Sequence, residues 1–288
     1  MFYFKWKSLN IKCIAVTLLI TGFVTTALEE KTYAEMRTYR NIDYVPTKIY
    51  ADNRDKLDIF MPKQASGVPI VIYFHGGALQ RGDKSQAEGL AAQLTERGIG
   101  VVSANYRLSP QVIHPAHIED AAEAVAWAYR NISSFGGDRN RLYLSGHSAG
   151  AYLATLLSLN ASYLEKHRVA LFNIRGTVAI SPFLYVEEVA PDRPKTVWGT
   201  DQKVWLQASV SPYVGDQKPP ILFIYADGDD DWRKQQNERL AGELRRAGNT
   251  GMTTSEISDR NHGTIISAMS NNSDPGMLQV AAFITGAY

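Results

Sequence analysis

A serine stands at the centre of residues 146–150, which read Gly-His-Ser-Ala-Gly and fit the pattern Gly-x-Ser-x-Gly. The run Arg141–Leu144 before it is apolar and typical of a strand, and the run Ala151–Leu157 after it favours a helix. A strand, a tight turn and a helix are the context in which this pattern holds a serine hydroxyl above a sheet as a nucleophile. The backbone N–H of Ala149 would then face the oxygen that becomes negative during acyl transfer. The pattern therefore predicts Ser148 as a nucleophile.

A serine hydroxyl is a weak nucleophile at neutral pH and needs an oriented base. In the arrangement that goes with this motif, an acid and then a histidine follow the serine along the chain. Two of the six histidines follow Ser148. His167 lies in the charged stretch Glu-Lys-His-Arg, which is typical of solvated surface, whereas His262 lies in a loop between the last predicted strand and the terminal helix. We therefore expect His262 to be the base.

The acid should follow the predicted strand Ile221–Tyr225, where residues 226–231 read Ala-Asp-Gly-Asp-Asp-Asp. Asp229 follows a glycine that permits a tight turn, which can direct its side chain back over the sheet. Asp227 lies closer to the end of the strand and is the alternative. The two later aspartates are better placed to cap the next helix. We therefore assign Asp229 as the acid, with Asp227 as its rival.

The same carboxylates raise a metal alternative. Three alternate aspartates beginning at Asp227, with Glu238 at the twelfth position, copy part of an EF-hand calcium loop. Trp232 stands where that loop requires glycine, and a strand rather than a helix precedes it. The His-Pro-Ala-His segment at 114–117 is no zinc motif, because proline breaks the helical face. We expect no metal and no cofactor.

The segment His-Gly-Gly-Ala at 75–78 follows an apolar run predicted to be the third strand. It resembles the His-Gly-Gly-Gly motif of lipases and esterases, whose backbone N–H groups bind an oxyanion. Because backbone groups are the donors, alanine can serve in the last position. We expect the amides of Gly77 and Ala78, together with that of Ala149, to form the oxyanion hole, and His75 to hold the loop in place.

Strand-like and helix-like runs alternate along the chain. The predicted strands are Val68–Phe74, Gly100–Asn105, Arg141–Leu144, Gly176–Ile180, Ile221–Tyr225 and Thr253–Ile257. The predicted helices are Ser85–Arg97, Pro115–Ser133, Ser148–Leu159, Arg233–Ala247 and Met277–Thr285. This alternation predicts an α/β fold with a mostly parallel central sheet and helices on both faces.

Two segments lie outside this alternation. Tyr39–Val45 and Lys56–Met61 alternate apolar and polar residues and are predicted to be antiparallel edge strands. The stretch Ser181–Pro220 has no clear periodicity, and its six prolines disfavour a long lid helix. Its aromatic residues either form a shallow wall beside the serine or pack on the sheet. We expect a small cap or none.

Composition sets broad limits on function. The chain has 288 residues, 45% of them hydrophobic and 20% charged, which is typical of a globular protein. A net charge of +1 gives no field that would favour nucleic acid as a partner. We expect a small-molecule substrate instead.

The N-terminus resembles a secretory signal peptide. Three lysines, the last at position 12, precede the apolar run Cys13–Val24, and no acidic residue comes before Glu29. Cleavage after Ala27 would leave residues 28–288 as a single exported domain, with no stable membrane association; a second small-residue site ends at Ala34. The alternative is an uncleaved membrane anchor, for which the apolar run is short.

Several motifs together resemble one family. Residues 57–62, 75–84, 105–110, 114–127 and 136–138, with the serine motif, look like those of α/β-hydrolase carboxylesterases. The branch they resemble holds hormone-sensitive-lipase-like enzymes, feruloyl esterases and kynurenine-formamidase-like enzymes, and the match covers about residues 40–288. The resemblance implies the triad of Ser148, Asp229 and His262. It also implies that Arg107 and Asp120 hold the scaffold.

Hydrolysis of small short-chain esters through an acyl-enzyme is the leading function that this resemblance implies. An arylformamidase acting on an N-formyl group is the enzymatic alternative, although Ala-Leu-Gln at 78–80 departs from the aromatic residue often found there in formamidase-like members. A non-catalytic binding protein with the same fold is the alternative from another class.

Overall fold

The computed structural model describes residues 1, 36–45, 50–189 and 194–286. The signal peptide predicted for residues 1–27 lies outside the described residues apart from Met1, so it stays a prediction, as does the domain boundary at residue 28. The described residues from 36 onward belong to one compact unit. Among them, no helix combines the length and the apolar character that crossing a membrane requires.

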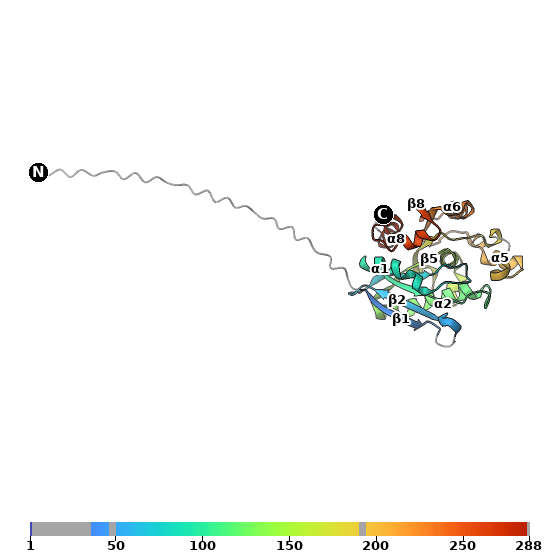
Figure 1. Ribbon diagram of the computed structural model, residues 1–288, viewed down its shortest axis with the longest axis horizontal. Helices are drawn as coiled ribbons and strands as arrows, with labels where there is room; N and C mark the ends of the chain where they lie inside the picture. The colour runs from blue at the N-terminus through green and yellow to red at the C-terminus, as the bar shows by residue number, and fades with distance from the viewer. Residues whose placement is uncertain (2–35, 46–49, 190–193, 287–288) are drawn as a thin grey trace. The chain divides into compact units, whose positions relative to one another are not determined.

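One eight-stranded sheet forms the centre of this unit (Figure 1), in the order β1-β2-β4-β3-β5-β6-β7-β8. Strands β3 to β8 are parallel to one another, and β2 is antiparallel to both of its neighbours, β1 and β4. The strands are β1 Arg37–Asp43, β2 Lys56–Met61, β3 Val68–Phe74, β4 Gly100–Ala104, β5 Gly137–His147, β6 Ile174–Ile180, β7 Ile221–Gly228 and β8 Met252–Asn261. The predicted parallel strands are therefore confirmed, and β5 begins four residues earlier than predicted.

The prediction that Lys56–Met61 is an edge strand is wrong. Strand β2 lies between β1 and β4, and only β1 occupies the edge. The polar residue that suggested a solvent-facing side, Asp58, is buried and forms ion pairs with Lys84 at 2.8 Å and Arg40 at 2.9 Å. A carboxylate paired in this way can occupy an interior strand, and hydropathy alternation does not reveal the pairing.

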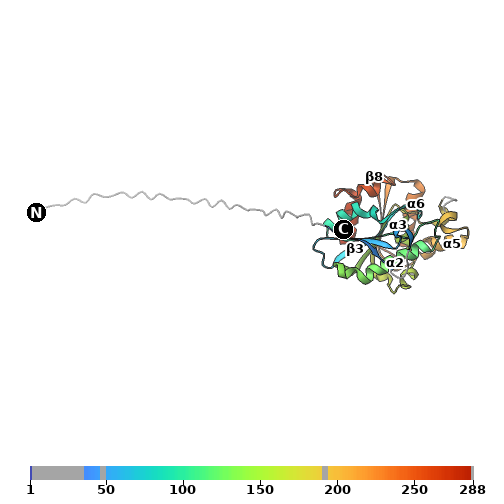
Figure 2. The same cartoon turned by 60° about the horizontal axis from the view of Figure 1, so that its bottom comes forward.

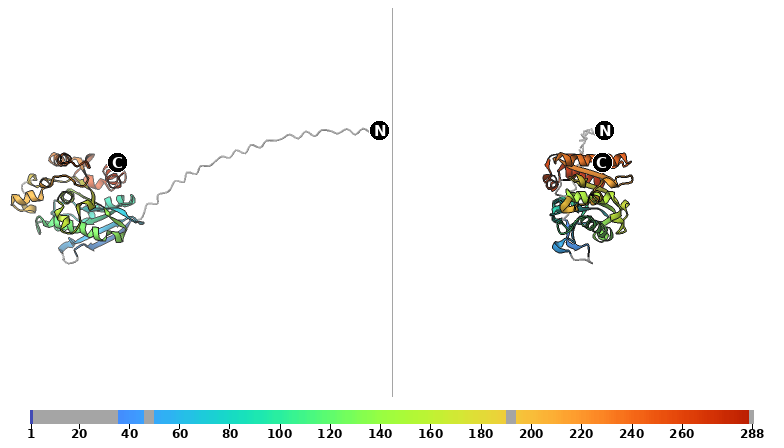
Figure 3. Two further views of the ribbon diagram at one scale, coloured as in Figure 1. Left: turned by 180° about the vertical axis from the view of Figure 1, so that it is seen from behind. Right: turned by 90° about the vertical axis from the view of Figure 1, so that its right-hand side faces the viewer.

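Helices cover both faces of the sheet (Figure 2; Figure 3). On one face, α2 and α3 pack against side chains such as Ile72 and Leu144. On the other face, α1, α7 and α8 pack against alternate residues such as Val71 and Tyr73. The α-helices are α1 Glu88–Glu96, α2 Ala116–Asn131, α3 Ala149–Leu159, α4 Ser162–Glu165, α5 Gln202–Ala208, α6 Asp231–Arg246, α7 Thr264–Ala268 and α8 Pro275–Thr285. Parallel strands buried on both faces explain the continuous apolar runs in the sequence.

No long lid helix occurs in the described part of the stretch 181–220. Its longest helix is α5, which has seven residues, and the others are the short turns Val186–Glu188, Pro194–Trp198 and Ser211–Tyr213. Phe183 and Trp198 are buried against Tyr152 of α3, with ring centroids 4.7 and 6.1 Å from the Tyr152 ring. These aromatic side chains therefore pack on the fold, and the expected small cap is what the structure contains.

Candidate active site

The turn that carries Ser148 joins the end of β5 to the start of α3. Ser148 has a φ of 54° and a ψ of −116°, a backbone conformation that is costly for a residue with a side chain. A Cβ atom at Gly150 would lie 1.9 Å from the carbonyl oxygen of Phe74, and one at Gly146 would lie 2.6 Å from the same oxygen. Only glycine fits at these two positions. The close approach of β3 to the turn is therefore the physical reason for the Gly-x-Ser-x-Gly spacing.

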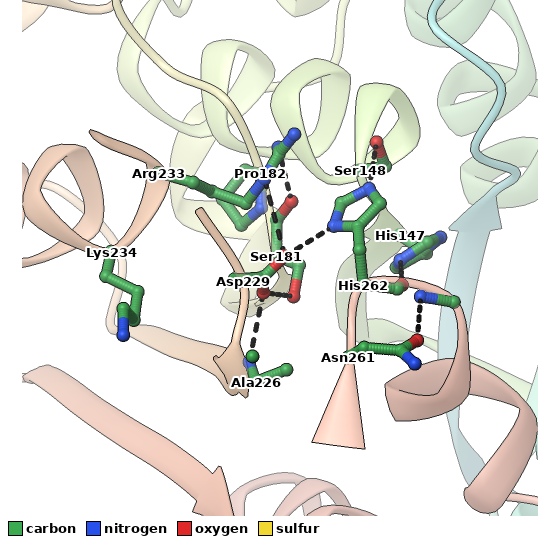
Figure 4. A network of polar contacts seen from close by, with 12 residues as sticks. His147, Ser148, Ser181, Pro182, Ala226, Asp229, Arg233, Lys234, Asn261 and His262 are labelled. Atoms are coloured by element: carbon green, nitrogen blue, oxygen red, sulfur yellow. Dashed lines mark hydrogen bonds and ion pairs between the residues drawn. The ribbon is translucent and has the colours of Figure 1, made fainter. Parts of the chain in front are cut away.

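A continuous hydrogen-bonded chain connects the three residues assigned from sequence (Figure 4). The Ser148 hydroxyl lies 3.0 Å from Nε2 of His262, and Nδ1 of His262 lies 2.6 Å from Oδ1 of Asp229. Asp229 follows the last residue of β7, and His262 follows the last residue of β8. The carboxyl ends of three parallel strands thus bring together side chains that are 33 and 114 residues apart.

The second oxygen of Asp229 is held from two sides. Oδ2 accepts hydrogen bonds from the hydroxyl of Ser181 at 2.5 Å and from the amide of Ala226 at 3.0 Å. Burial alone would raise the pKa of Asp229, but the hydrogen bonds from His262, Ser181 and Ala226 outweigh it and hold the pKa below its usual value. Asp229 is therefore ionised at neutral pH, and its Oδ1 accepts a hydrogen bond from the N–H at Nδ1 of His262.

Asp227, the rival acid, has a different role. Its carboxylate accepts hydrogen bonds from the backbone amides of Gly228, Asp259 and Arg260 at 2.9 to 3.0 Å. These bonds fasten the end of β7 to the end of β8. Asp227 therefore holds the strand that leads to His262 and does not contact the His262 ring.

The carboxylates that suggested a calcium loop point to different partners. The Asp231 side chain is 87% exposed, and Glu238 accepts a hydrogen bond from Tyr225. Asp230 takes the N-cap position of α6 without a side-chain capping bond. Among the described residues, no group of three or more histidine, cysteine, aspartate or glutamate side chains is arranged to hold a metal ion.

His147 is a site residue that the sequence did not reveal. Its Nε2 donates a hydrogen bond to the backbone carbonyl of His262 at 2.7 Å, and the two rings lie 4.8 Å apart. Burial lowers the pKa of His147 to about 4, so the ring is neutral at neutral pH. His147 therefore anchors the residue that carries the expected base. The position is one of the two variable positions in Gly-x-Ser-x-Gly, so the motif carries no signal for it.

The loop expected to bind the oxyanion has a strained backbone. Gly77 has a φ of +116°, and a Cβ atom there would lie 2.1 Å from the carbonyl oxygen of Arg81. Ala78 and Leu79 follow with φ values of 57° and 63°. Ala149 is the first residue of α3, where a backbone N–H has no acceptor within the helix. Gly77, Ala78 and Ser148 line the same cavity, and the assignment of the Gly77, Ala78 and Ala149 amides as the oxyanion hole stays a prediction.

His75 is buried beneath this loop, as expected for a residue that holds it in place. Its ring stacks on Tyr106 at 4.3 Å, and the Tyr106 hydroxyl donates to the His75 carbonyl at 2.8 Å. Arg107 lies three residues after the end of β4 and forms a two-point ion pair with Asp120, with contacts of 2.6 and 2.8 Å. The scaffold role expected for Arg107 and Asp120 agrees with this geometry.

A cavity of about 350 Å³ opens above Ser148. Its walls include the residues of the oxyanion loop, the serine turn and the base: Gly76, Gly77, Ala78, Arg81, Gln86, His147, Ser148, Arg233, His262 and Ile266. A larger hollow of about 650 Å³ lies at the ends of β7 and β8 near Asp227. It is not lined by Ser148 or His262, so the smaller cavity is the candidate site.

Comparisons with known proteins agree with this architecture. The model of the BD-FAE family matches residues 57–244. The isoprenylcysteine alpha-carbonyl methylesterase of Arabidopsis thaliana is 36% identical over 166 residues, which are 56% of this chain and 37% of the relative. Esterase LipQ of Mycobacterium tuberculosis is 28% identical over 232 residues, which are 74% of this chain and 55% of that protein. The chain thus spans about a third to a half of the length of these curated relatives.

A solved structure shares the fold. The truncated form of a carbohydrate esterase from gut microbiota superposes with a TM-score of 0.74 at 22% identity, covering 89% of this chain and 97% of that one. The α/β-hydrolase fold and the resemblance to esterases of that fold are therefore confirmed. The chain belongs to the BD-FAE family.

Proposed function

We propose that this protein is a serine carboxylesterase that hydrolyses small short-chain esters through an acyl-enzyme. The observation that carries the proposal is the hydrogen-bonded chain from Asp229 through His262 to Ser148, which ends at the cavity beside the oxyanion loop. In the family comparisons, the named relatives are esterases. That agreement favours an ester over a formamide as the substrate.

The proposed reaction begins when Oγ of Ser148 attacks the ester carbonyl carbon while Nε2 of His262 accepts the hydroxyl proton. The carbonyl oxygen becomes negative and accepts hydrogen bonds from the amides of Gly77, Ala78 and Ala149. Protonated His262 then donates its proton to the leaving alkoxide, and the acyl group stays on Ser148. A water molecule then attacks the acyl-enzyme while it gives a proton to His262. His262 returns this proton to Oγ of Ser148 as the bond between Oγ and the acyl carbon breaks, which releases the acid and restores the serine.

Asp229 determines which nitrogen of His262 carries the proton. Because its carboxylate accepts from Nδ1, the lone pair of the neutral ring lies on Nε2, facing Ser148. The ionised carboxylate also stabilises the imidazolium that forms in each step.

The size of the cavity and the short cap support a preference for small acyl groups. A fully buried methylene contributes about 0.8 kcal/mol, but a shallow site without a lid buries few of them.

Pre-steady-state hydrolysis of p-nitrophenyl acetate tests the proposal. A burst of p-nitrophenol equal to the enzyme concentration, absent in Ser148→Ala, is the expected result. Turnover of N-formylkynurenine in place of acetate esters would favour the formamidase alternative. The lack of both would leave a binding protein with a hydrolase fold.

A further inference from the structure

The cavity above Ser148 has positively charged walls. Two of its ten lining residues, Arg81 and Arg233, carry guanidinium groups, and none of the ten is acidic. Hydrolysis of a neutral ester, as proposed above, uses the hydroxyl, the imidazole and backbone amides, and it needs no guanidinium in the cavity wall. The two arginines therefore call for a separate explanation.

Arg233 is a buried residue, with 5% of its surface exposed. It stands in the first turn of α6, and its side chain extends toward Ser181 and Pro182 (Figure 4). Arg233 lines the same cavity as Ser148 and His262. One nitrogen donates to the Ser181 carbonyl at 3.0 Å, and Nε lies 3.5 Å from Oδ1 of Asp229. These contacts fix the guanidinium beside the reacting groups, where burial strengthens its interaction with an anion.

Arg81 reaches the cavity from a different element. It follows the oxyanion loop, and its amide donates to the Gly77 carbonyl at 3.1 Å. Its Cγ lies 3.0 Å from the point where a Cβ of Gly77 would stand, so the stem of the side chain lies over the oxyanion loop. The side chain is exposed, which leaves it accessible to an incoming molecule.

We propose that the substrate ester carries a carboxylate, and that Arg233 and Arg81 bind this group beside Ser148. This inference rests on the proposed esterase function and specifies its substrate class. A guanidinium suits this task because its planar donors match the two oxygens of a carboxylate. The carboxylate belongs either to the acyl part or to the alcohol part of the ester, and the cavity presents the same charge to both.

Matched substrate pairs measure the effect of this charge. On the acyl side, the pair is monomethyl glutarate and its uncharged amide, methyl glutaramate, with acid release followed in a pH-stat. On the alcohol side, the pair is 4-acetoxybenzoate and 4-acetoxybenzamide. In at least one pair, kcat/KM for the carboxylate should exceed that for the amide by about tenfold or more, since a hydrogen bond to a charged group contributes roughly this factor. The preference should shrink as the salt concentration rises to 1 M.

Variants of the two arginines test whether these residues cause the preference for the carboxylate over the amide. Arg233→Gln and Arg81→Gln should each reduce the ratio of carboxylate to amide, by about tenfold for the buried Arg233 and less for the exposed Arg81. Lys234→Gln is the matched control, because it removes the same charge one residue further along α6. Its Nζ donates to the Asp227 carbonyl at 3.0 Å, and the side chain points away from Ser148 (Figure 4). Its ratio should equal that of the wild type.

Equal rates for carboxylate and amide in both pairs would overturn the proposal. So would variants that lower both rates by the same factor, since the arginines would then act on the fold or on the chemistry. If Arg233→Gln does not fold, the Arg81→Gln ratio and the salt series of the wild type decide. A failure of the esterase function itself is recognised separately, because the wild type would then hydrolyse neither p-nitrophenyl acetate nor any of the four esters.

Discussion

Replacing Asp229 by asparagine should move the ring proton of His262 from Nδ1 to Nε2. Both Ser181 and the amide of Ala226 donate to Oδ2, so the oxygen of an asparagine side chain must take that position. Its NH₂ group then takes the place of Oδ1, 2.6 Å from Nδ1 of His262, and donates to it. The ring proton is forced onto Nε2, which can no longer accept the proton of Ser148.

The magnitude follows from this tautomer. An enzyme whose acid is changed in this way keeps its geometry and loses about 10⁴-fold in kcat, or roughly 5.5 kcal/mol of transition-state stabilisation. The variant should fold normally, because asparagine has nearly the same shape and keeps the oxygen that faces Ser181 and Ala226. The measurement is kcat with p-nitrophenyl acetate, accompanied by the melting temperature.

Asp227→Asn is the matched control. It changes the same charge two residues away, on a carboxylate that fastens β7 to β8 through the amides of Asp259 and Arg260. We expect a lower melting temperature with most of the turnover retained. A larger loss of kcat in Asp227→Asn than in Asp229→Asn would refute the reasoning about both aspartates.

Four further outcomes are expected. His147→Ala should lose about 10²-fold in kcat because His262 loses the donor to its carbonyl, and His147→Gln, which keeps a donor, should recover part of it; equal losses would contradict this role. Burial lowers the pKa of His75, His114 and His147 to about 4 and that of His117 to about 3. The unfolded chain therefore takes up protons below pH 6.5 while the folded chain does not, so the free energy of unfolding should fall from pH 6.5 toward pH 4; urea titrations showing no change there would refute this. For p-nitrophenyl esters, kcat/KM should be highest from acetyl to butyryl, and a maximum at decanoyl or longer would contradict the shallow site. The exported protein should begin near residue 28 or 35, as determined from its intact mass, whereas a membrane-bound form that keeps Met1 would support an anchor.

Local patterns predicted the turn at Ser148 and most of the sheet. The glycines around the serine are dictated by contacts with Phe74, and the buried parallel strands leave apolar runs that are visible in the sequence. The start of β5 was predicted four residues too late because residues 137–140 are glycine and polar residues, most of which lie outside the core. Structure that depends on residues adjacent in the sequence, such as the serine turn and the apolar strands, could thus be predicted.

Contacts between loops that are far apart in the sequence could not be predicted. His147 meets the His262 carbonyl across 115 residues, and Ser181 meets Asp229 across 48. Neither Ser181 nor Arg233 belongs to a motif, and each is recognisable only when the ends of β6 and β7 stand side by side. The buried ion pairs of Asp58 were missed for the same reason, and this led to the wrong placement of β2.

Covalent labelling of the serine tests the central claim most directly. A p-nitrophenyl alkylphosphonate should react once per chain, release one p-nitrophenol and add its phosphonyl group to the peptide that contains Ser148, as shown by mass spectrometry. The same treatment of Ser148→Ala should give no label and no release, and that variant should retain less than about a thousandth of the wild-type turnover. A label on another residue, or turnover by Ser148→Ala close to the wild-type value, would contradict the assignment of Ser148 as the nucleophile.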